Sequence, residues 1–406
     1  MAPSIVPSGL DLTDPALVAE GVPFEQLAEL RASAPVWWNA QGPTPFGDEG
    51  FWAVTRYADV KEISIKPELF STWANGSIVR FAPEMTREDI DMQRLIMINV
   101  DPPDHTKLRR IVSRGFTPRA IKLLRDALAE RAERIVTEAA AKGAGDFVTE
   151  VACELPLQAI AELIGIDQED RGKIFDWSNQ MIAYDDPEYE IDPAVAAAEL
   201  INYAMVLGAD RLEHPRSDIV TTLMHADLED RGLTPDEFAF FVLLLAVAGN
   251  ETTRNAMTHG MLGFFEFPDQ WERYRSERLA TTADEVVRWG TPVMVFQRTA
   301  LVDTTIGGVD IAQGQRVGLY YSSANFDPEV FDQPHHFDIG RSPNPHLGFG
   351  GGGPHYCLGA NLARLELDLM FSAIADHMPN IRQAGPARRL RSGWLNGIKE
   401  LPVSFR

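Results

Sequence analysis

A glycine-rich stretch that ends on a cysteine is the part of this sequence best suited to chemistry. Four consecutive glycines (residues 350–353) and Pro354 rule out a helix or an ordinary strand, so we expect an open loop. An apolar helical pattern over residues 358–377 follows Cys357 directly. Free backbone N–H groups and the dipole at a helix N-terminus favour a thiolate over a thiol. Because glycines leave room for a large flat group, a thiolate here suits the axial ligand of a haem iron.

Two other interpretations of this stretch stay open when it is taken by itself. Gly348, Gly350 and Gly353 match the spacing of a dinucleotide-binding loop. No hydrophobic strand leads into them, however, and no acid closes a βαβ unit. The second alternative is a structural turn beside a cysteine that is buried incidentally.

A second unusual stretch interrupts a long apolar helix. Thr234, Pro235 and Glu237 form a strong helix start with a capping box, and the helical pattern runs to about residue 265. It is nearly apolar all round as far as residue 248, so we expect it to be buried. The run 248–253, Ala-Gly-Asn-Glu-Thr-Thr, then places polar groups in the buried helix. Such a cost in stability usually marks a functional site.

The residue types of this run suit oxygen chemistry. Activating dioxygen requires protons in an otherwise dry pocket, which Glu251 could relay from solvent while Thr252 hydrogen-bonds the oxygen ligand. Ala248 and Gly249 have no bulk and leave space for dioxygen. We expect Thr253 to bond back to a helix carbonyl instead.

The charge and composition of the chain exclude several classes of protein. The 406 residues carry a net charge of −22, which argues against nucleic acid or an anionic membrane as partner. The only cysteines, Cys153 and Cys357, form no disulfide framework, so a reducing cytoplasm is expected. The most apolar run, residues 238–249, is shorter than the roughly 20 residues of a membrane span, and the N-terminus has no signal-peptide pattern. We therefore predict a cytoplasmic protein without a membrane anchor.

The periodicity predicts a mainly α fold with a small β region in a single domain, 1–406, of which residues 1–23 are an N-terminal extension. Strands are expected at 36–38 and 51–55. Further helices are expected at 24–32, 57–65, 106–115, 118–142, 148–164, 169–183 and 193–213. Residues 71–97 lack periodicity and form a long irregular segment of the kind that is usually functional; a surface excursion is the alternative.

These motifs together resemble the cytochrome P450 family of haem-thiolate monooxygenases, from about residue 24 to the C-terminus. The cysteine loop of that family is a Phe, glycines, a basic residue two before the Cys, and Cys-x-Gly, here Phe349, His355, Cys357 and Gly359. Phe349 lies eight residues before Cys357 where seven is commonest; the longer spacing is typical of an actinobacterial sterol-oxidising subgroup. The resemblance implies haem b, iron protoporphyrin IX, held between the central helix and this loop, with the Cys357 thiolate on the metal.

The resemblance also assigns roles to charged residues. His105 and Arg109, four apart on one helical face, would bind the haem propionates together with Arg298 and His355. Each one alone could be a solvated surface charge. By the same resemblance, the ion pair of Glu285 and Arg288, completed by His336, braces the cysteine-loop region. The spacing of that pair is uninformative by itself, because it recurs at residues 272 and 275.

The partners follow from the resemblance as well. Electrons would come from NAD(P)H through a ferredoxin reductase and an acidic ferredoxin, and O2 is the co-substrate. A basic face would receive the ferredoxin, a solvated face without a partner being the alternative. This face consists of Lys107, Arg110, Arg114, Arg119 and Lys122.

The substrate is predicted to be hydrophobic. Residues 114–120 and 391–399 resemble actinobacterial enzymes that oxidise the terminal methyl of the cholesterol side chain. We therefore expect oxidation at the terminal (26/27) carbon of a sterol or sterol ketone, such as cholesterol or cholest-4-en-3-one. An apolar lining suits such a molecule, with core packing as the alternative role of each side chain. The predicted lining is Ile78, Val79, Ile96, Met97, Val247, Val293, Met294, Val295 and Leu395.

Three alternatives for the function stay open. The same chemistry could act on a fatty acid, a terpenoid or a polyketide. The chain could instead be a non-catalytic haem-thiolate sensor or carrier, although such a protein has no need of the acid–alcohol pair Glu251 and Thr252. The third alternative is a binding protein without haem.

Overall fold

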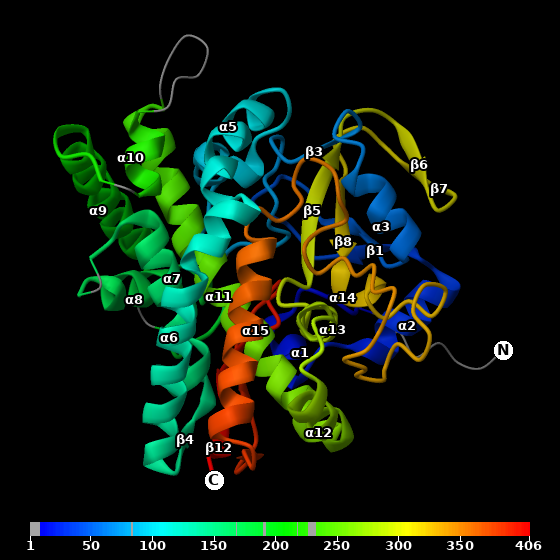
Figure 1. Ribbon diagram of the computed structural model, residues 1–406. Helices are drawn as coiled ribbons and strands as arrows, with labels where there is room; N and C mark the ends of the chain where they lie inside the picture. Colours follow the sequence, from blue (N-terminus) through cyan, green and yellow to red (C-terminus); the bar gives the residue numbers. More distant parts are fainter. Residues whose placement is uncertain (1–8, 83, 168, 190–191, 217, 226–232) are drawn as a thin grey trace.

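The computed structural model describes residues 9–406 except 83, 168, 190–191, 217 and 226–232. A large helical part and a smaller part with β-strands lie side by side (Figure 1). This arrangement confirms the predicted mainly α fold with a small β region. No described helix combines the length and the apolar character that a membrane span requires.

The described helices are these: α1 Pro15–Glu20, α2 Phe24–Ser33, α3 Tyr57–Ser64, α4 Arg87–Met92, α5 Asp104–Val112, α6 Pro118–Lys142, α7 Glu154–Ile164, α8 Arg171–Ile182, α9 Pro193–Glu213, α10 Ile219–Met224, α11 Pro235–Glu266, α12 Pro268–Glu277, α13 Thr282–Gly290, α14 Tyr321–Ala324 and α15 Ala360–His377. The strands are β1 Val36–Ala40, β2 Gly50–Val54, β3 Phe70–Ser71, β4 Ala144–Asp146, β5 Val295–Ala300, β6 Thr304–Ile306, β7 Val309–Ile311, β8 Arg316–Tyr320, β9 Arg382–Gln383, β10 Arg388–Arg389, β11 Ile398–Glu400 and β12 Pro402–Ser404.

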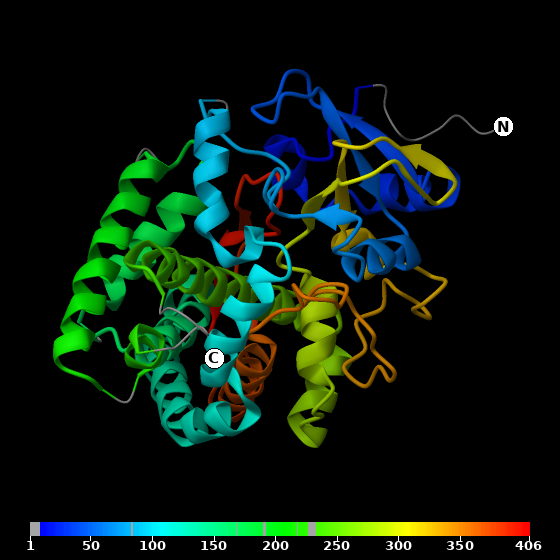
Figure 2. The same cartoon turned by 90° about the horizontal axis from the view of Figure 1, so that it is seen from above.

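The central helix α11 organises the helical part. It begins with the predicted capping box: the Thr234 hydroxyl accepts from the Glu237 N–H at 3.1 Å, and the Glu237 carboxylate accepts from the Thr234 N–H at 2.9 Å. Seen from above, α11 crosses the middle of the helical part (Figure 2). Contacts with α7, α8, α9, α13 and α15 surround it. This packing explains why the first half of the helix is apolar on every side.

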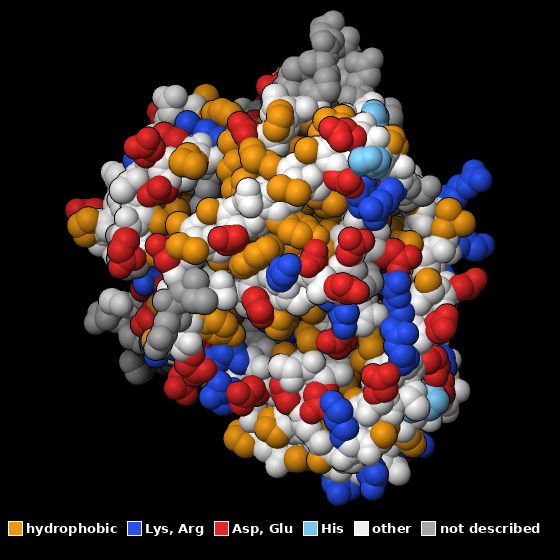
Figure 3. Space-filling view, turned by 90° about the vertical axis from the view of Figure 1, so that its left-hand side faces the viewer, with side chains coloured by type: hydrophobic (Ala, Val, Ile, Leu, Met, Phe, Trp, Pro, Cys, Tyr) orange, Lys and Arg blue, Asp and Glu red, His pale blue; other side chains and the backbone are white. Residues whose placement is uncertain are grey.

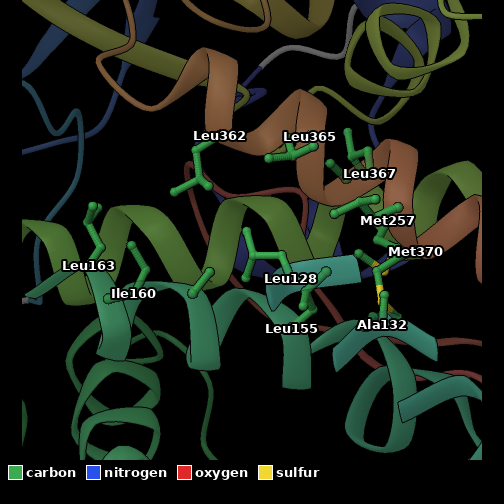
Figure 4. Close-up of a cluster of buried hydrophobic side chains, with 14 of the residues drawn as sticks. Leu128, Ala132, Leu155, Ile160, Leu163, Met257, Leu362, Leu365, Leu367 and Met370 are labelled. Atoms are coloured by element: carbon green, nitrogen blue, oxygen red, sulfur yellow. The ribbon is translucent and has the colours of Figure 1, made fainter. Parts of the chain in front are cut away.

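A hydrophobic cluster sets the position of the helix that follows the cysteine loop. Leu362, Leu365 and Met370 of α15 point toward Leu128 of α6 and Leu155 of α7 (Figure 4). Because burial of such side chains stabilises the contact by about 25 cal/mol per Å², α15 is held firmly, and its N-terminus holds the cysteine loop.

The five-stranded sheet has the order β1-β2-β8-β5-β3. The β2–β8 pair is parallel, whereas β5 runs antiparallel to both β8 and β3. Arg298 in the middle of β5 lies opposite Val317 of β8 and is buried. The sheet therefore presents a buried arginine toward the helical part.

Several element boundaries differ from the sequence prediction. The predicted helix 148–164 is broken into a π-helical turn, Val148–Ala152, and α7, with Cys153 between them. The irregular segment 71–97 contains α4, which a capping box of Thr86 and Asp89 starts. A short helix, α1, lies within the predicted N-terminal extension, where Asp14 caps it.

The outer face of α9 and α10 is chemically mixed. Figure 3 shows hydrophobic side chains interspersed with acidic and basic ones on this side of the molecule. Val195, Met205, Val206 and Leu212 of α9 are exposed there.

Candidate functional site

A cavity lies between the middle of α11 and the cysteine loop, and it gathers most of the predicted cofactor site. The predicted residues that line it are Thr252, His105, Arg109, Ala248, Gly249, Arg298, Phe349, His355, Cys357 and Gly359. Cys153, the other cysteine, lies elsewhere and donates its thiol to the Thr149 carbonyl at 3.1 Å. The cavity is therefore the place where a cysteine could meet a bound group.

The cysteine loop depends on glycine for a steric reason. Gly350, Gly352 and Gly353 adopt φ angles of +95°, +93° and +71°, which L side chains rarely adopt. A Cβ on Gly353 would lie 2.3 Å from the Ser64 carbonyl oxygen of α3. The Cys357 N–H donates to the Phe349 carbonyl at 2.9 Å and closes the loop. The backbone thus approaches α3 closely while the cysteine faces the cavity.

Burial controls the charge of the cysteine. In the chain by itself, burial raises the pKa of the Cys357 thiol, whereas the backbone N–H groups of Gly359 and Ala360 and the charge of Arg109 lower it in part. The helix N-terminus therefore favours the thiolate as predicted, but in the chain alone desolvation outweighs this effect. A thiolate here needs a further positive charge, and a bound metal ion would supply one.

Cationic side chains without an acidic ion-pair partner among the described residues gather at one end of the cavity. The rings of His105 and His355 lie 4.3 Å apart, centroid to centroid. Burial, with the charge of Arg298, lowers the pKa of His355 to about 2. Burial, with the charge of Arg109, lowers that of His105 to about 4. The buried Nδ1 of His105 has no hydrogen-bond partner among the described residues.

Within the described part of the chain, the two arginines of this cationic group bond to backbone carbonyls. Arg298 donates to the carbonyl of Gln297 at 2.7 Å, and Arg109 donates to the carbonyl of Tyr356. Burial lowers the pKa of both guanidiniums. A ligand with carboxylates would relieve this desolvation, so the group fits the two propionates of haem.

The back-bond predicted for one threonine of α11 is made by the other. The Thr252 hydroxyl donates to the Ala248 carbonyl at 2.6 Å, so the back-bonding residue is Thr252 and the prediction for Thr253 is wrong. The side chain of Thr253 lies beside the carboxyl of Glu366 instead. Both threonines line the cavity, but the Thr252 hydroxyl bonds a carbonyl of its own helix whereas Thr253 has the Glu366 carboxyl beside it.

Gly249 has a packing role in addition to its place at the cavity. A Cβ on Gly249 would lie 2.3 Å from Cδ1 of Ile160 on α7. The missing side chain therefore lets α7 approach α11, a role that the sequence analysis did not predict.

Glu251 lies behind the cavity wall rather than in it. Its side chain is 1% exposed and forms an ion pair with Arg254. Its Oε1 also accepts from the Asn255 side chain at 2.8 Å. Arg254 in turn donates to Oδ1 of Asn179 on α8 at 3.0 Å. The carboxylate is therefore held by charge and cannot reach the cavity without a change of partners.

Glu366 on α15 is a candidate that the sequence prediction missed. It lines the same cavity, is 1% exposed, and neither of its oxygens has a well-aligned hydrogen-bond partner among the described residues. Burial raises its pKa to about 8, and Thr253 offsets the rise only in part. An acid amid the apolar positions Leu362, Leu365 and Leu369 was the available signal.

The predicted ion pair of Glu285 and Arg288 is present, but the side chain that joins it is not that of His336. Arg288 and Glu285 are fully buried and share two hydrogen bonds of 2.8 Å. Arg341, which the prediction did not name, bonds the same carboxylate at 3.1 Å. His336 contributes only its carbonyl, because its ring packs on Phe267 with centroids 5.1 Å apart.

The predicted substrate side chains divide into three groups. Met97 and Val293 line the cavity. Ile96 packs against the main core. The remainder lie in a neighbouring hydrophobic cluster: Ile78, Val79, Val247, Met294, Val295 and Leu395. The cavity wall above α11 is formed largely by apolar side chains that the prediction did not name, including Phe116, Phe241, Leu244, Leu245 and Phe296.

Comparisons with known proteins agree with this site. The family model described as Cytochrome P450 matches residues 197–377. A steroid C26-monooxygenase of Rhodococcus jostii is 62% identical over 403 residues, covering 99% of this chain and 86% of the relative. A methyl-branched lipid omega-hydroxylase of Mycobacterium tuberculosis is 40% identical, covering 93% of this chain and 90% of the relative.

A solved structure shares the whole fold. A cytochrome P450 of Mycobacterium marinum in complex with pseudoionone superimposes with a TM-score of 0.90 at 35% identity, covering 99% of this chain and 100% of that one. Proteins of this family bind haem through a cysteine thiolate. With near-complete coverage at 62% identity and a cavity that ends on a cysteine, this chain belongs to the cytochrome P450 family of haem-thiolate monooxygenases.

Proposed function

We propose that this monooxygenase oxidises the terminal side-chain carbon, C26, of a sterol or sterol ketone such as cholest-4-en-3-one. The observation that carries the proposal is the 62% identity, over 99% of the chain, to a protein named steroid C26-monooxygenase. The apolar wall of the cavity agrees with it: Phe116, Phe241, Leu244 and Leu245 offer no charged group to a substrate. A terminal methyl has no polar handle, so shape must position it.

In this proposal Cys357 is the thiolate ligand of haem b. The cationic group of His105, Arg109, Arg298 and His355 holds the propionates, because these four line one cavity and lack acidic ion-pair partners among the described residues. Bound haem supplies the activation of dioxygen with electrons from a redox partner. The protein positions the haem and the substrate, keeps water out of the pocket and delivers protons.

The proton route uses two residues of α11. The Thr252 hydroxyl stands on the cavity wall and can release its bond to the Ala248 carbonyl to donate into the cavity. Glu251 can carry protons from the outer side of α11 once it separates from Arg254. Glu285 and Arg288 keep their proposed bracing role, with His336 acting through its carbonyl.

The redox partner is proposed to be an acidic ferredoxin that a NAD(P)H-dependent reductase reduces in the cytoplasm. Lys107, Arg110, Arg119 and Lys122 of α5 and α6 are exposed and form a basic face in a strongly acidic protein. The side chain of Arg114, predicted for the same face, lies outside the described part of the structure. Complementary charge would steer the two proteins together and make their association salt-dependent.

A spectral titration tests the substrate. Cholest-4-en-3-one should convert the haem of the ferric enzyme from low to high spin with saturation at low concentration, and a long unbranched fatty acid should do so weakly. Turnover with a ferredoxin and its reductase should then give the C26 alcohol. A strong response to the fatty acid alone would reject the sterol proposal. Normal substrate binding without any turnover would favour a sensor or carrier.

A second candidate substrate class has its own observation. The methyl-branched lipid omega-hydroxylase is 40% identical over most of the chain. A methyl-branched fatty acid therefore belongs in the same titration. Tighter binding and faster turnover of this lipid than of the sterol would assign the enzyme to branched lipids.

A further inference from the structure

A second cavity, of about 490 Å³, lies along the C-terminal half of α11 and shares no lining residue with the cavity beside Cys357. It is bounded by the C-terminal half of α11, by α13 and by β10. Its floor is buried and includes His259, Phe326 and Asn396. Its rim includes the exposed Glu266 and His335. This volume lies within the range of about 300–1,000 Å³ that is usual for small-molecule sites.

One arginine of this cavity has no ion-pair partner among the described residues. Nη1 of Arg389 donates to Oδ1 of Asn396 on the floor at 2.9 Å. No described carboxylate, including that of Glu266 on the rim, forms an ion pair with it. Because a guanidinium has five N–H donors, most of those of Arg389 remain available to a ligand.

Most buried arginines of the described chain are paired with a carboxylate, although Arg31 bonds only to Ser323; Arg389 itself is half-buried. Each of the following forms an ion pair with a carboxylate: Arg211, Arg254, Arg288 and Arg316. Arg109 and Arg298, which lack such a pair, face the cavity where we place the haem propionates. Burial, the sole cause, also lowers the pKa of Arg389. Arg389 thus shares the lack of a carboxylate partner with two arginines for which we propose an anionic ligand.

The walls of the cavity suit a flat apolar body. The rings of Phe24 and Trp289 lie against Phe326, with centroids 4.4 and 5.8 Å away. His259 on the floor hydrogen-bonds the Asn396 carbonyl through Nε2 at 2.9 Å. Burial lowers the pKa of His259 to about 3, so this ring adds no charge near neutral pH. The negative charge of Glu266 at the rim disfavours a ligand with a second carboxylate.

We propose that this cavity is a ligand site for a small aromatic monocarboxylate. The carboxylate would bind the free N–H groups of Arg389, and the ring would lie among Phe24, Trp289 and Phe326. A charge-assisted, forked hydrogen bond is the strongest contact that this cavity offers.

Calorimetric titration of the haem-loaded enzyme with 2-naphthoate tests the site. We expect saturable binding, an unchanged Soret band because the probe stays away from the haem, and at least tenfold weaker binding of the neutral 2-naphthamide. Absence of saturable binding at millimolar probe would overturn the proposal. So would equal affinity for the amide, or binding that shifts the Soret band.

Substitutions in the cavity test whether 2-naphthoate binds there. Arg389→Gln should weaken 2-naphthoate binding at least tenfold. Arg388→Gln is the matched control, because Arg388 is the adjacent residue of β10, is exposed and pairs with Glu188 and Glu400; it should bind within twofold of the wild type. Leu262→Trp, which fills the cavity with Arg389 intact, should also abolish binding and guards against a folding defect in the first variant. Wild-type affinity in Arg389→Gln or in Leu262→Trp would place the probe elsewhere and overturn the proposal.

Discussion

Glu251 and Arg254 form an ion pair three residues apart on α11, at a point where both side chains are almost fully buried. Arg254 is also bound to α8, through Asn179 and over the ring of Phe175 at 5.9 Å. The acid that we propose as proton carrier is therefore tied, through one arginine, to a helix outside the haem pocket. On the proposed proton route Arg254 must leave this carboxylate, and its contacts with α8 hold Arg254 in place.

Glu251→Gln should slow turnover about 10²-fold, because the amide cannot carry a proton. Haem content and the substrate-induced spin shift should stay unchanged, since Glu251 does not line the cavity. Steady-state turnover in H2O and D2O measures the effect, and the variant should show the larger solvent isotope effect. Asp236→Asn, an acid-to-amide change at the exposed start of the same helix, is the control. A variant as fast as the wild type would exclude Glu251 from the proton route.

Thr252→Ala should keep haem and substrate but release hydrogen peroxide in place of product, because it removes a hydroxyl of the cavity wall that the proposed proton route uses. The ratio of product formed to NADH consumed measures this. Thr258→Ala serves for comparison: Thr258 makes the same kind of back-bond, to the Arg254 carbonyl at 2.9 Å, away from the cavity. If coupling in Thr252→Ala equals that of the wild type, Thr252 has no part in proton delivery.

Glu366→Gln should change how stability depends on pH. The folded protein holds the proton on this carboxyl up to about pH 8, whereas the unfolded chain releases it near 4.5. The contribution of Glu366 to stability is thus fully present below 4.5 and is lost as the pH rises through 8. Relative to the wild type, the variant should gain about 2–4 °C in melting temperature between pH 5.5 and 8.5.

Thermal unfolding of the haem-loaded proteins at several pH values measures this difference. Glu400→Gln, a change at a half-exposed acid on β11, should show no such trend. Parallel curves for Glu366→Gln and the wild type would mean that Glu366 is ionised in the folded enzyme.

Gly353→Ala should weaken the cysteine loop, because a methyl group would meet the Ser64 carbonyl oxygen at 2.3 Å and the φ angle of +71° strains an L residue. The cost is expected to be about 1–3 kcal/mol or more, with lower haem retention. Gly359→Ala meets no described atom within 4 Å, so it should leave the stability of the chain unchanged. Soret absorbance per protein and melting temperature report both effects. Equal behaviour of the two variants would remove the steric explanation.

Local interactions explain what could be read directly from the sequence. The bounds of α6 and α9 agree with the prediction residue for residue, because Thr117 and Asp192 cap them and a proline follows each cap. The capping box of α11 is equally local. The cysteine loop was predictable because glycine and proline restrict the backbone without help from the rest of the fold.

Packing between residues distant in the sequence decided which side chains face the cavity and which charges they carry. The direction of a side chain around a helix depends on which neighbours pack there, so only the tertiary structure assigned the back-bond to Thr252 rather than Thr253. The tertiary structure also shows that the side chain beside Glu285 is that of Arg341, whereas the prediction named His336. Desolvation likewise comes from atoms distant in the sequence, which is why the raised pKa values of Cys357 and Glu366 could not be foreseen. The sequence by itself determined the residue types of the haem site and the family, whereas the fold decided which groups face the cavity and in which charge state.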